Sequence, residues 1–134
     1  MKEPEHVEQR QLFRWIAMHE ARVPELRLAY AIPNGRKRTE AEAGKLKAEG
    51  VRRGVPDVAL DVARRGHHGL RIEMKAPGKL KDTSAEQDEW HRLLRAEGYL
   101  VVVCDRWQLA WNQMMTYLDR YSLLLDPTLI PPLR

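Results

Sequence analysis

The chain has 134 residues, a length that predicts one domain and excludes separate catalytic and recognition modules. Lysine and arginine outnumber aspartate and glutamate by 23 to 19, a net charge of +4 that permits a polyanionic partner without requiring one. The lone Cys104 excludes a disulfide framework and a thiolate metal cluster. Because no apolar stretch approaches the roughly 20 residues of a membrane helix and no signal segment is evident, we expect a cytoplasmic protein with no membrane partner.

The first predicted element is a helix over residues 5–20. Its apolar stripe contains Leu12 and Ile16, with Gln9 on the same side. Glu5 continues this stripe one turn earlier, whereas Glu8 is rotated to one side. We therefore expect Glu5, and not Glu8, to direct its carboxylate at the core from this helix; a frayed, solvated helix start is the alternative.

A strand over 28–32 and a turn at 33–35 follow, then a helix that Thr39 caps and Gly50 ends. The segment 51–54 comes next, with glycines on both sides of its two arginines. Glycines let the backbone approach another surface closely, either the protein's own sheet or a DNA strand. Arg52 and Arg53 are accordingly the first candidates for phosphate contact.

Two alternating runs, 57–62 and 70–75, predict neighbouring antiparallel strands joined by the polar loop 64–69. Glu73 and Lys75 are two residues apart and share a face, while Ile72 and Met74 take the apolar face. Asp57, at the start of the first run, can share the face of Glu73 at one end of the sheet.

Two carboxylates that converge repel each other, and a hard divalent cation such as Mg²⁺ relieves that repulsion. A metal-bound water is a better nucleophile, and a neighbouring ammonium can orient it or hold a phosphate oxygen. Asp57, Glu73 and Lys75 therefore suit phosphodiester hydrolysis. The alternative is that Asp57 caps a turn and the other two lie on a solvated strand face.

After Lys75 comes the basic loop 76–82, then a helix from a Ser84 cap to Glu97. Gln87, Trp90 and Leu94 share one face of this helix, so the Gln87 amide should point inward beside the site; an ordinary core glutamine is the alternative.

Residues 99–104 form a continuous apolar run, typical of a central strand covered on both faces. A helix over 107–118 follows, with Trp107 and Trp111 either in the core or on a dimer surface. The apolar, proline-broken tail should pack on the domain or across a partner. The five histidines form no zinc spacing, and we interpret them as surface or packing residues.

Taken together, the segments Gly50 to Asp57, Gly69 to Lys75, and Gln87 with Trp90 resemble the VRR-NUC family, a branch of the PD-(D/E)xK nuclease superfamily. The resemblance is to its small single-domain members from phages and bacteria, and covers most of the chain. Met74 stands where the family usually has Leu or Val. Its side chain is expected on the apolar face of the strand, where this change should be tolerated. The resemblance implies an α/β fold: a restriction-endonuclease-like core with a mixed central sheet flanked by helices.

Further expectations come from the resemblance alone. It implies a Mg²⁺- or Mn²⁺-dependent endonuclease for branched DNA, and a homodimer that resolves four-way junctions, in a bacterial or phage-infected cell. It assigns Glu5 as a third metal ligand beside Asp57 and Glu73, and places Gln87 in the active-site set. The nuclease domain would span 1–120 and the tail 121–134.

Cationic side chains concentrate in the middle of the chain, around the predicted site, which favours phosphate contacts over a merely solvated surface. The predicted DNA contacts are Arg36, Lys37, Arg38, Arg52, Arg53, Lys79 and Lys81. Two other functions stay open: a general DNA nuclease or nickase of the same fold, and a non-catalytic DNA-binding module. A monomer would favour the general nuclease, and the intact lysine of the motif argues against the binding module.

Overall fold

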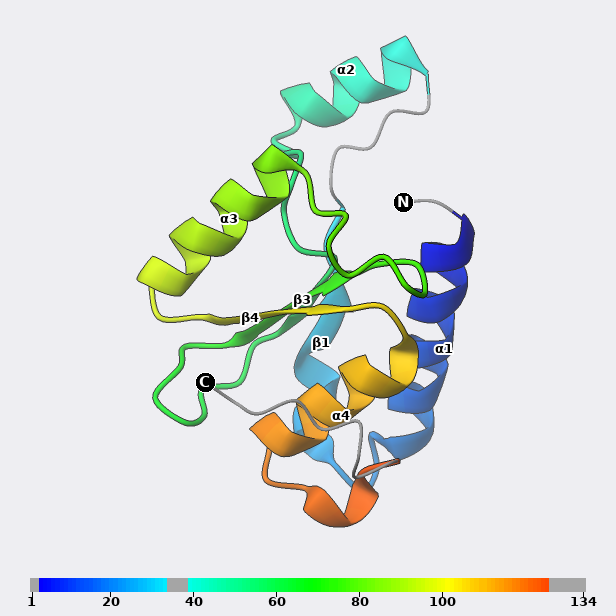
Figure 1. Ribbon diagram of the computed structural model, residues 1–134, viewed down its shortest axis with the longest axis vertical. Coiled ribbons are helices and arrows are strands. Elements are labelled where there is room, and N and C mark those ends of the chain that lie inside the picture. Colours follow the sequence, from blue (N-terminus) through cyan, green and yellow to red (C-terminus); the bar gives the residue numbers. More distant parts are fainter. Residues whose placement is uncertain (1–2, 34–38, 126–134) are drawn as a thin grey trace.

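The computed structural model describes residues 3–33 and 39–125, which form four helices and four strands (Figure 1). The helices are α1 (Glu3–His19), α2 (Glu40–Ala48), α3 (Ala85–Ala96) and α4 (Trp107–Tyr117), with short 3₁₀ turns at Pro24–Leu28 and Tyr121–Leu123. The strands are β1 (Ala29–Ala31), β2 (Val58–Leu60), β3 (Leu70–Met74) and β4 (Leu100–Cys104). The predicted α/β class is confirmed. None of the described helices combines the length and apolar character needed to cross a membrane.

The four strands form one mixed sheet in the order β1-β2-β3-β4. β2 pairs antiparallel with both β1 and β3, and β3 pairs parallel with β4. The predicted antiparallel pairing of the strands on either side of the 64–69 loop is therefore confirmed. A parallel pair needs a crossover connection, and α3 provides it between β3 and β4.

The prediction that 99–104 forms a central strand is wrong, because β4 is an edge strand of the sheet formed by the described residues. Its two faces are nevertheless both covered, since β4 contacts α3 and α4. Leu100, Val102 and Cys104 belong to the core on the α4 side, whereas Val101 is buried outside that cluster. A continuous apolar run indicates that both faces of a strand are covered, and not how many strands lie beside it.

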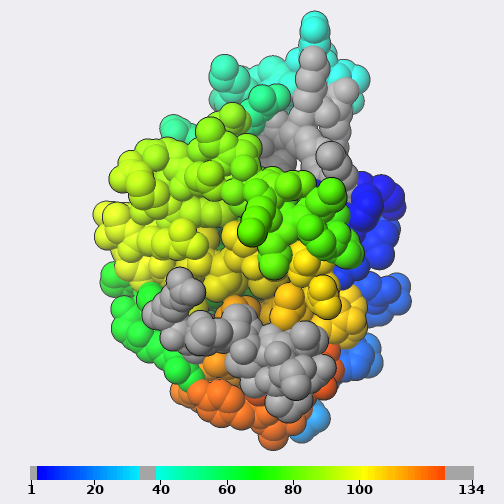
Figure 2. Space-filling model, in the orientation of Figure 1, coloured from blue at the N-terminus to red at the C-terminus, as the bar shows by residue number. Residues whose placement is uncertain are grey.

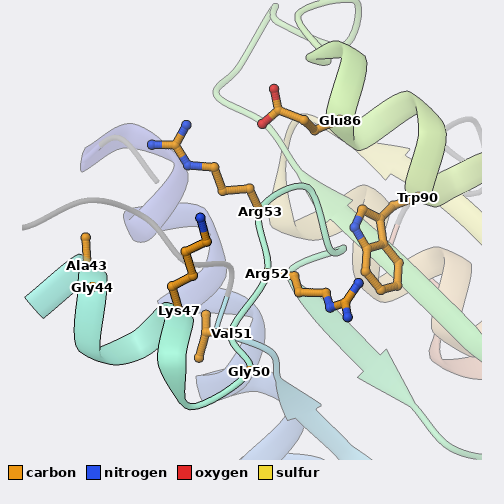
Figure 3. Close-up of a pocket in the computed structure, with 9 residues that line it drawn as sticks. All are labelled: Ala43, Gly44, Lys47, Gly50, Val51, Arg52, Arg53, Glu86 and Trp90. Atoms are coloured by element: carbon orange, nitrogen blue, oxygen red, sulfur yellow. The ribbon is translucent and has the colours of Figure 1, made fainter.

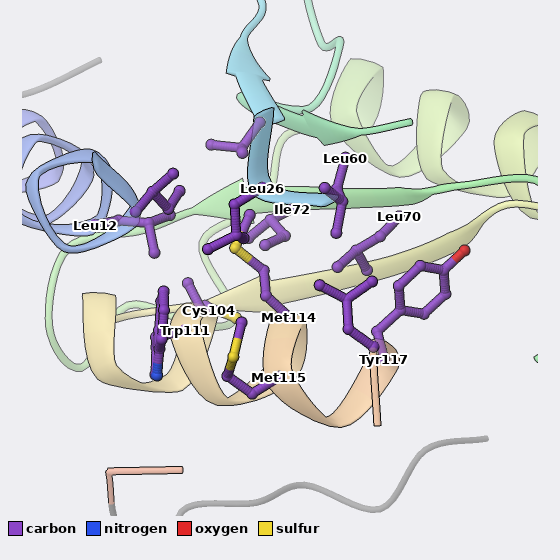
Figure 4. Packing of buried hydrophobic residues seen from close by; sticks show 14 of the residues in the cluster. Leu12, Leu26, Leu60, Leu70, Ile72, Cys104, Trp111, Met114, Met115 and Tyr117 are labelled. Carbon is purple, nitrogen blue, oxygen red and sulfur yellow. The ribbon is translucent and has the colours of Figure 1, made fainter. Parts of the chain in front are cut away.

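The main core lies between the sheet and the pair α1 and α4 (Figure 4). Leu12 and Ile16 of α1, Ile72 of β3, and Trp111 and Met114 of α4 are all buried there. The core alternative for the tryptophans is confirmed, because Trp111 is fully buried and Trp107 packs against the same cluster.

The predicted tail is described only as far as residue 125. Leu123 and Leu124 pack against the core, and residues 126–134 lie outside the described part of the chain. At the opposite end of the molecule, α2 projects from the body (Figures 1 and 2). Thr39 caps α2 through a hydrogen bond from the Glu42 N–H, as predicted.

Candidate active site

The centre of the site is a pair of carboxyl groups on adjacent strands. β2 and β3 align Val58 with Ile72, so one further step of this antiparallel register places Asp57 opposite Glu73. Both residues are buried, with 3% and 1% of their surface exposed. Asp57 is held in place because its Oδ2 accepts a 2.7 Å hydrogen bond from the Met74 N–H. The structure thus brings the two predicted acids together and excludes the alternative of a solvated strand face.

Burial changes the acidity of both groups. Loss of hydration raises the pKa of Asp57 to about 9 and that of Glu73 to about 7, because charged carboxylates are disfavoured away from water. A hydrogen bond between them raises the pKa of Asp57 further and lowers that of Glu73, the pattern of a proton held on Asp57 and shared with Glu73. Without a cation, the pair keeps protons that an exposed pair would lose.

Lys75 and Gln87 complete the immediate surroundings of Glu73. The Lys75 ammonium, on a side chain that is 7% exposed, donates to Gln87 Oε1 over 2.9 Å. Gln87 Nε2 donates in turn to Glu73 Oε2 over 3.1 Å. Because the charge of Lys75 also lowers the pKa of Glu73, the lysine opposes the effect of burial on this acid.

The orientation of the Gln87 amide follows from its place at the start of α3. Ser84 and Gln87 form a capping box in which Ser84 Oγ accepts from the Gln87 N–H and Gln87 Oε1 accepts from the Ser84 N–H. With Oε1 taken by Ser84 and Lys75, the NH₂ group is directed at Glu73. The helix cap therefore also supports the site.

The sequence-based interpretation of His91 as a surface or packing residue misses its contact with the site. It is 3% exposed, and its Nε2 lies 3.3 Å from Glu73 Oε1. Burial lowers the pKa of His91, so the neutral ring donates its Nε2–H to the carboxylate. The signal was present in the sequence, because His91 follows Gln87 by four residues and such residues share a helix face.

The first helix presents its two candidate carboxylates differently. Glu8 Oε1 accepts a 2.8 Å hydrogen bond from the Trp107 N–H, and so caps α4, whose own N-cap residue Arg106 makes no side-chain cap. Glu5 lies close enough to the carboxyl pair for its charge to raise the pKa of both Asp57 and Glu73. This placement agrees with the prediction that Glu5, and not Glu8, faces the site.

The donor chemistry of the pair fits a hard divalent cation. Two oxygen ligands are enough for Mg²⁺, which usually keeps several waters and binds through one or two carboxylates plus substrate phosphates. In residues 3–33 and 39–125, no three His, Cys, Asp or Glu side chains gather closely enough to form a metal cage. Glu5 therefore faces the site without completing a three-carboxylate set.

The predicted basic residues lie in three segments. Arg52 and Arg53 are exposed on the segment between α2 and β2, beside α3. Lys79 and Lys81 are exposed on the loop after β3, which is tied to the end of β4 by a 2.9 Å hydrogen bond from the Gly78 N–H to Asp105 Oδ2. Arg36, Lys37 and Arg38 lie outside the described residues.

A mixed sheet that presents Asp57, Glu73 and Lys75 at one end defines the PD-(D/E)xK-like class of fold. A family model described as the VRR-NUC domain matches residues 4–107. A solved structure, titled a VRR_NUC domain protein, is 32% identical with a TM-score of 0.59, and the match covers 70% of each chain. No match was found among curated proteins. The chain belongs to the VRR-NUC family, and so is a nuclease-type DNA-processing domain.

Proposed function

We propose that the protein is a metal-dependent endonuclease that hydrolyses phosphodiester bonds in branched DNA. The observation that carries this proposal is the buried pair of Asp57 and Glu73 with the Lys75 ammonium beside it. Burying two adjacent acids is unfavourable unless a proton or a cation neutralises them. A protein gains nothing structural from this arrangement that apolar residues would not provide, so we assign it to catalysis.

Asp57 and Glu73 would hold Mg²⁺ or Mn²⁺, with Glu5 as a further carboxylate on the same side. When bound, the cation would supply a water of lowered pKa and neutralise charge on the phosphate. Lys75, oriented by Gln87, is suited to hold a phosphate oxygen or to orient the attacking water. Gln87 and His91 each donate to a different oxygen of Glu73, and so fix the plane of this carboxylate.

Branched DNA as substrate and a homodimer as the active form extend this proposal. Their support is the VRR-NUC family membership of the chain, together with the resemblance of its motifs to family members that act on four-way junctions. A two-fold dimer would present two sites to opposed strands of a four-way junction. The exposed cations Arg52, Arg53, Lys79 and Lys81 would contact phosphates around the cut.

The experiment compares a labelled four-way junction with a linear duplex made from the same arms, in Mg²⁺ or in EDTA. Wild type and Asp57→Ala are measured together, and sedimentation gives the oligomeric state. We expect cuts that require metal, prefer the junction and disappear in the variant. Equal cutting of both substrates, or a monomer, would indicate a general nuclease. Tight binding without any cutting would contradict catalysis and indicate a DNA-binding module.

A further inference from the structure

A groove lies beside the active site, between α2, the segment 50–54 and the first half of α3 (Figure 3). Its volume is about 800 Å³. Its lining comes from α2, from the segment 50–54 and from α3, and it includes three cationic side chains. The lining residues that matter here are Lys47, Arg52, Arg53, Glu86 and Trp90.

The charge of the groove suits a polyanion. Lys47, Arg52 and Arg53 supply three positive charges against the single carboxylate of Glu86. Within the described ranges, none of these three cations forms a salt bridge, whereas Arg64, Arg65 and Arg71 elsewhere are paired. Cations that line a hollow without a salt bridge among the described residues are available to phosphates.

The second feature of the groove is an indole that has no role in the core. Trp90 is partly buried, yet among the described residues it belongs neither to the main core nor to the apolar side chains packed against it. It also lines an adjoining hollow with Ile32 and Pro33, so the ring borders open space on more than one side. Arg52 extends toward this ring (Figure 3).

Gly54 fixes the groove relative to the active site. A Cβ on this residue would lie 2.7 Å from the Glu86 carbonyl carbon and oxygen, and its φ is +87°, so the segment packs directly on the first turn of α3. That turn also carries Gln87, and Trp90 precedes His91. Along the helix axis, Trp90 therefore lies roughly 4.5 Å from Gln87 and roughly 1.5 Å from His91, the two residues that hold Glu73.

We propose that this groove binds an unpaired nucleotide of the DNA substrate, with its base stacked on Trp90 and its flanking phosphates on Lys47, Arg52 and Arg53. The inference rests on the proposed nuclease function and names the part of the substrate that this groove takes. A base inside a duplex has both faces covered by its neighbours, whereas a base at a branch point or in a single strand offers a free face. The indole thereby distinguishes branched or single-stranded DNA from continuous duplex.

The test measures binding in EDTA, so that no strand is cut. The probes are a branched DNA with 2-aminopurine as an unpaired base, whose fluorescence falls on stacking, and a fully paired duplex. Because stacking on an aromatic ring contributes about 1–3 kcal/mol, Trp90→Leu should weaken binding of the unpaired probe about 5- to 150-fold and abolish the quenching. Trp90→Phe, which keeps an aromatic face, should retain most of both. Duplex binding should be unchanged.

A charge-matched pair tests the phosphate part of the proposal. Arg53→Gln should weaken binding of the unpaired probe, whereas Glu86→Gln, an equally small change that removes the opposing charge, should strengthen it. Melting temperatures equal to that of the wild type would show that each variant is folded. Equal losses for Trp90→Leu on the unpaired and duplex probes, quenching that persists in this variant, or unchanged binding of the unpaired probe by Arg53→Gln would overturn the proposal.

Failure of this inference can be distinguished from failure of the proposed function. Metal-dependent cutting with no effect of Trp90→Leu on the unpaired probe would leave the nuclease and remove the stacking groove. Conversely, binding that depends on Trp90 without any metal-dependent cutting would leave the groove and remove the nuclease.

Discussion

Replacing Asp57 by asparagine should stabilise the metal-free protein, although the same change should abolish its activity. Asp57 is 3% exposed, and its carboxyl group is hydrogen-bonded to Glu73. Asparagine has nearly the same shape, and its Oδ1 can still accept the hydrogen bond from the Met74 N–H. Its NH₂ group can donate to Glu73. The substitution therefore removes an unfavourable ionisable group from the pair and keeps the surrounding hydrogen bonds.

The magnitude follows from the pKa of Asp57, which is about 9 in the folded protein against an ordinary 3.8. Between these values the folded state holds a proton that the unfolded chain has released, so the free energy of unfolding falls as the pH rises through this interval. Because pH 7 lies roughly three units above the ordinary pKa of the group, keeping this carboxyl protonated at pH 7 costs at most about 4 kcal/mol of the free energy of unfolding. We expect Asp57→Asn to raise the free energy of unfolding at pH 7 by about half of this amount, which corresponds to a rise in melting temperature of about 6–8 °C.

The assay is thermal unfolding of wild type and Asp57→Asn in EDTA from pH 5 to pH 8.5. The difference between the two proteins should be small at pH 5 and grow with pH. Added Mg²⁺ should raise the melting temperature of the wild type more than that of the variant. Asp82→Asn makes the same chemical change at an exposed loop position and should have no comparable effect. A variant that melts at or below the wild-type temperature at pH 8 in EDTA would refute the reasoning.

Three other predictions concern the surroundings of the site. Gly54→Ala should lower the free energy of unfolding, measured in urea, by about 2–4 kcal/mol, and Gly66→Ala by about 1 kcal/mol. Both glycines have a positive φ, but of the two only Gly54 lacks space for a Cβ. Equal losses in the two variants would contradict this reasoning. His91→Leu should weaken Mg²⁺ binding, measured by calorimetry, about 10-fold. His91→Gln keeps a hydrogen-bond donor and should weaken it less. Equal weakening in the two variants would show that His91 contributes only by packing. Glu5→Gln should weaken metal binding, whereas Glu8→Gln should lower the free energy of unfolding by about 0.5–1 kcal/mol. The reverse result would assign the metal site to Glu8 and a structural role to Glu5.

Much of the site could be predicted from local sequence because short-range backbone geometry determines it. Side chains two apart on a strand share a face, so Glu73 and Lys75 had to lie together. The polar loop 64–69 indicated a hairpin, and the hairpin brought Asp57 opposite Glu73. Ser84 and Gln87 have the spacing of a capping box, which the structure contains.

The features that sequence reasoning missed depend on contacts between distant segments. The position of β4 at a sheet edge depends on which strands pair with it, and an apolar run does not encode that number. His91 becomes part of the site only because α3 packs over β4 and brings this side chain to Glu73. Similarly, Glu8 has a role only because α1 meets the start of α4, nearly one hundred residues later in the chain.

The sequence by itself therefore determined the fold class, the helix caps, and the shared face of Glu73 and Lys75 opposite Asp57. The caps and the shared face follow from the periodicity of helices and strands and from turn chemistry, which act over a few residues, whereas the fold class followed from the family resemblance. Only the tertiary structure decided the acidity of the carboxyl pair, the hydrogen bond from His91, and the groove beside Trp90. Each of these arises from burial or close approach between elements far apart in the chain, and so depends on how the whole domain packs.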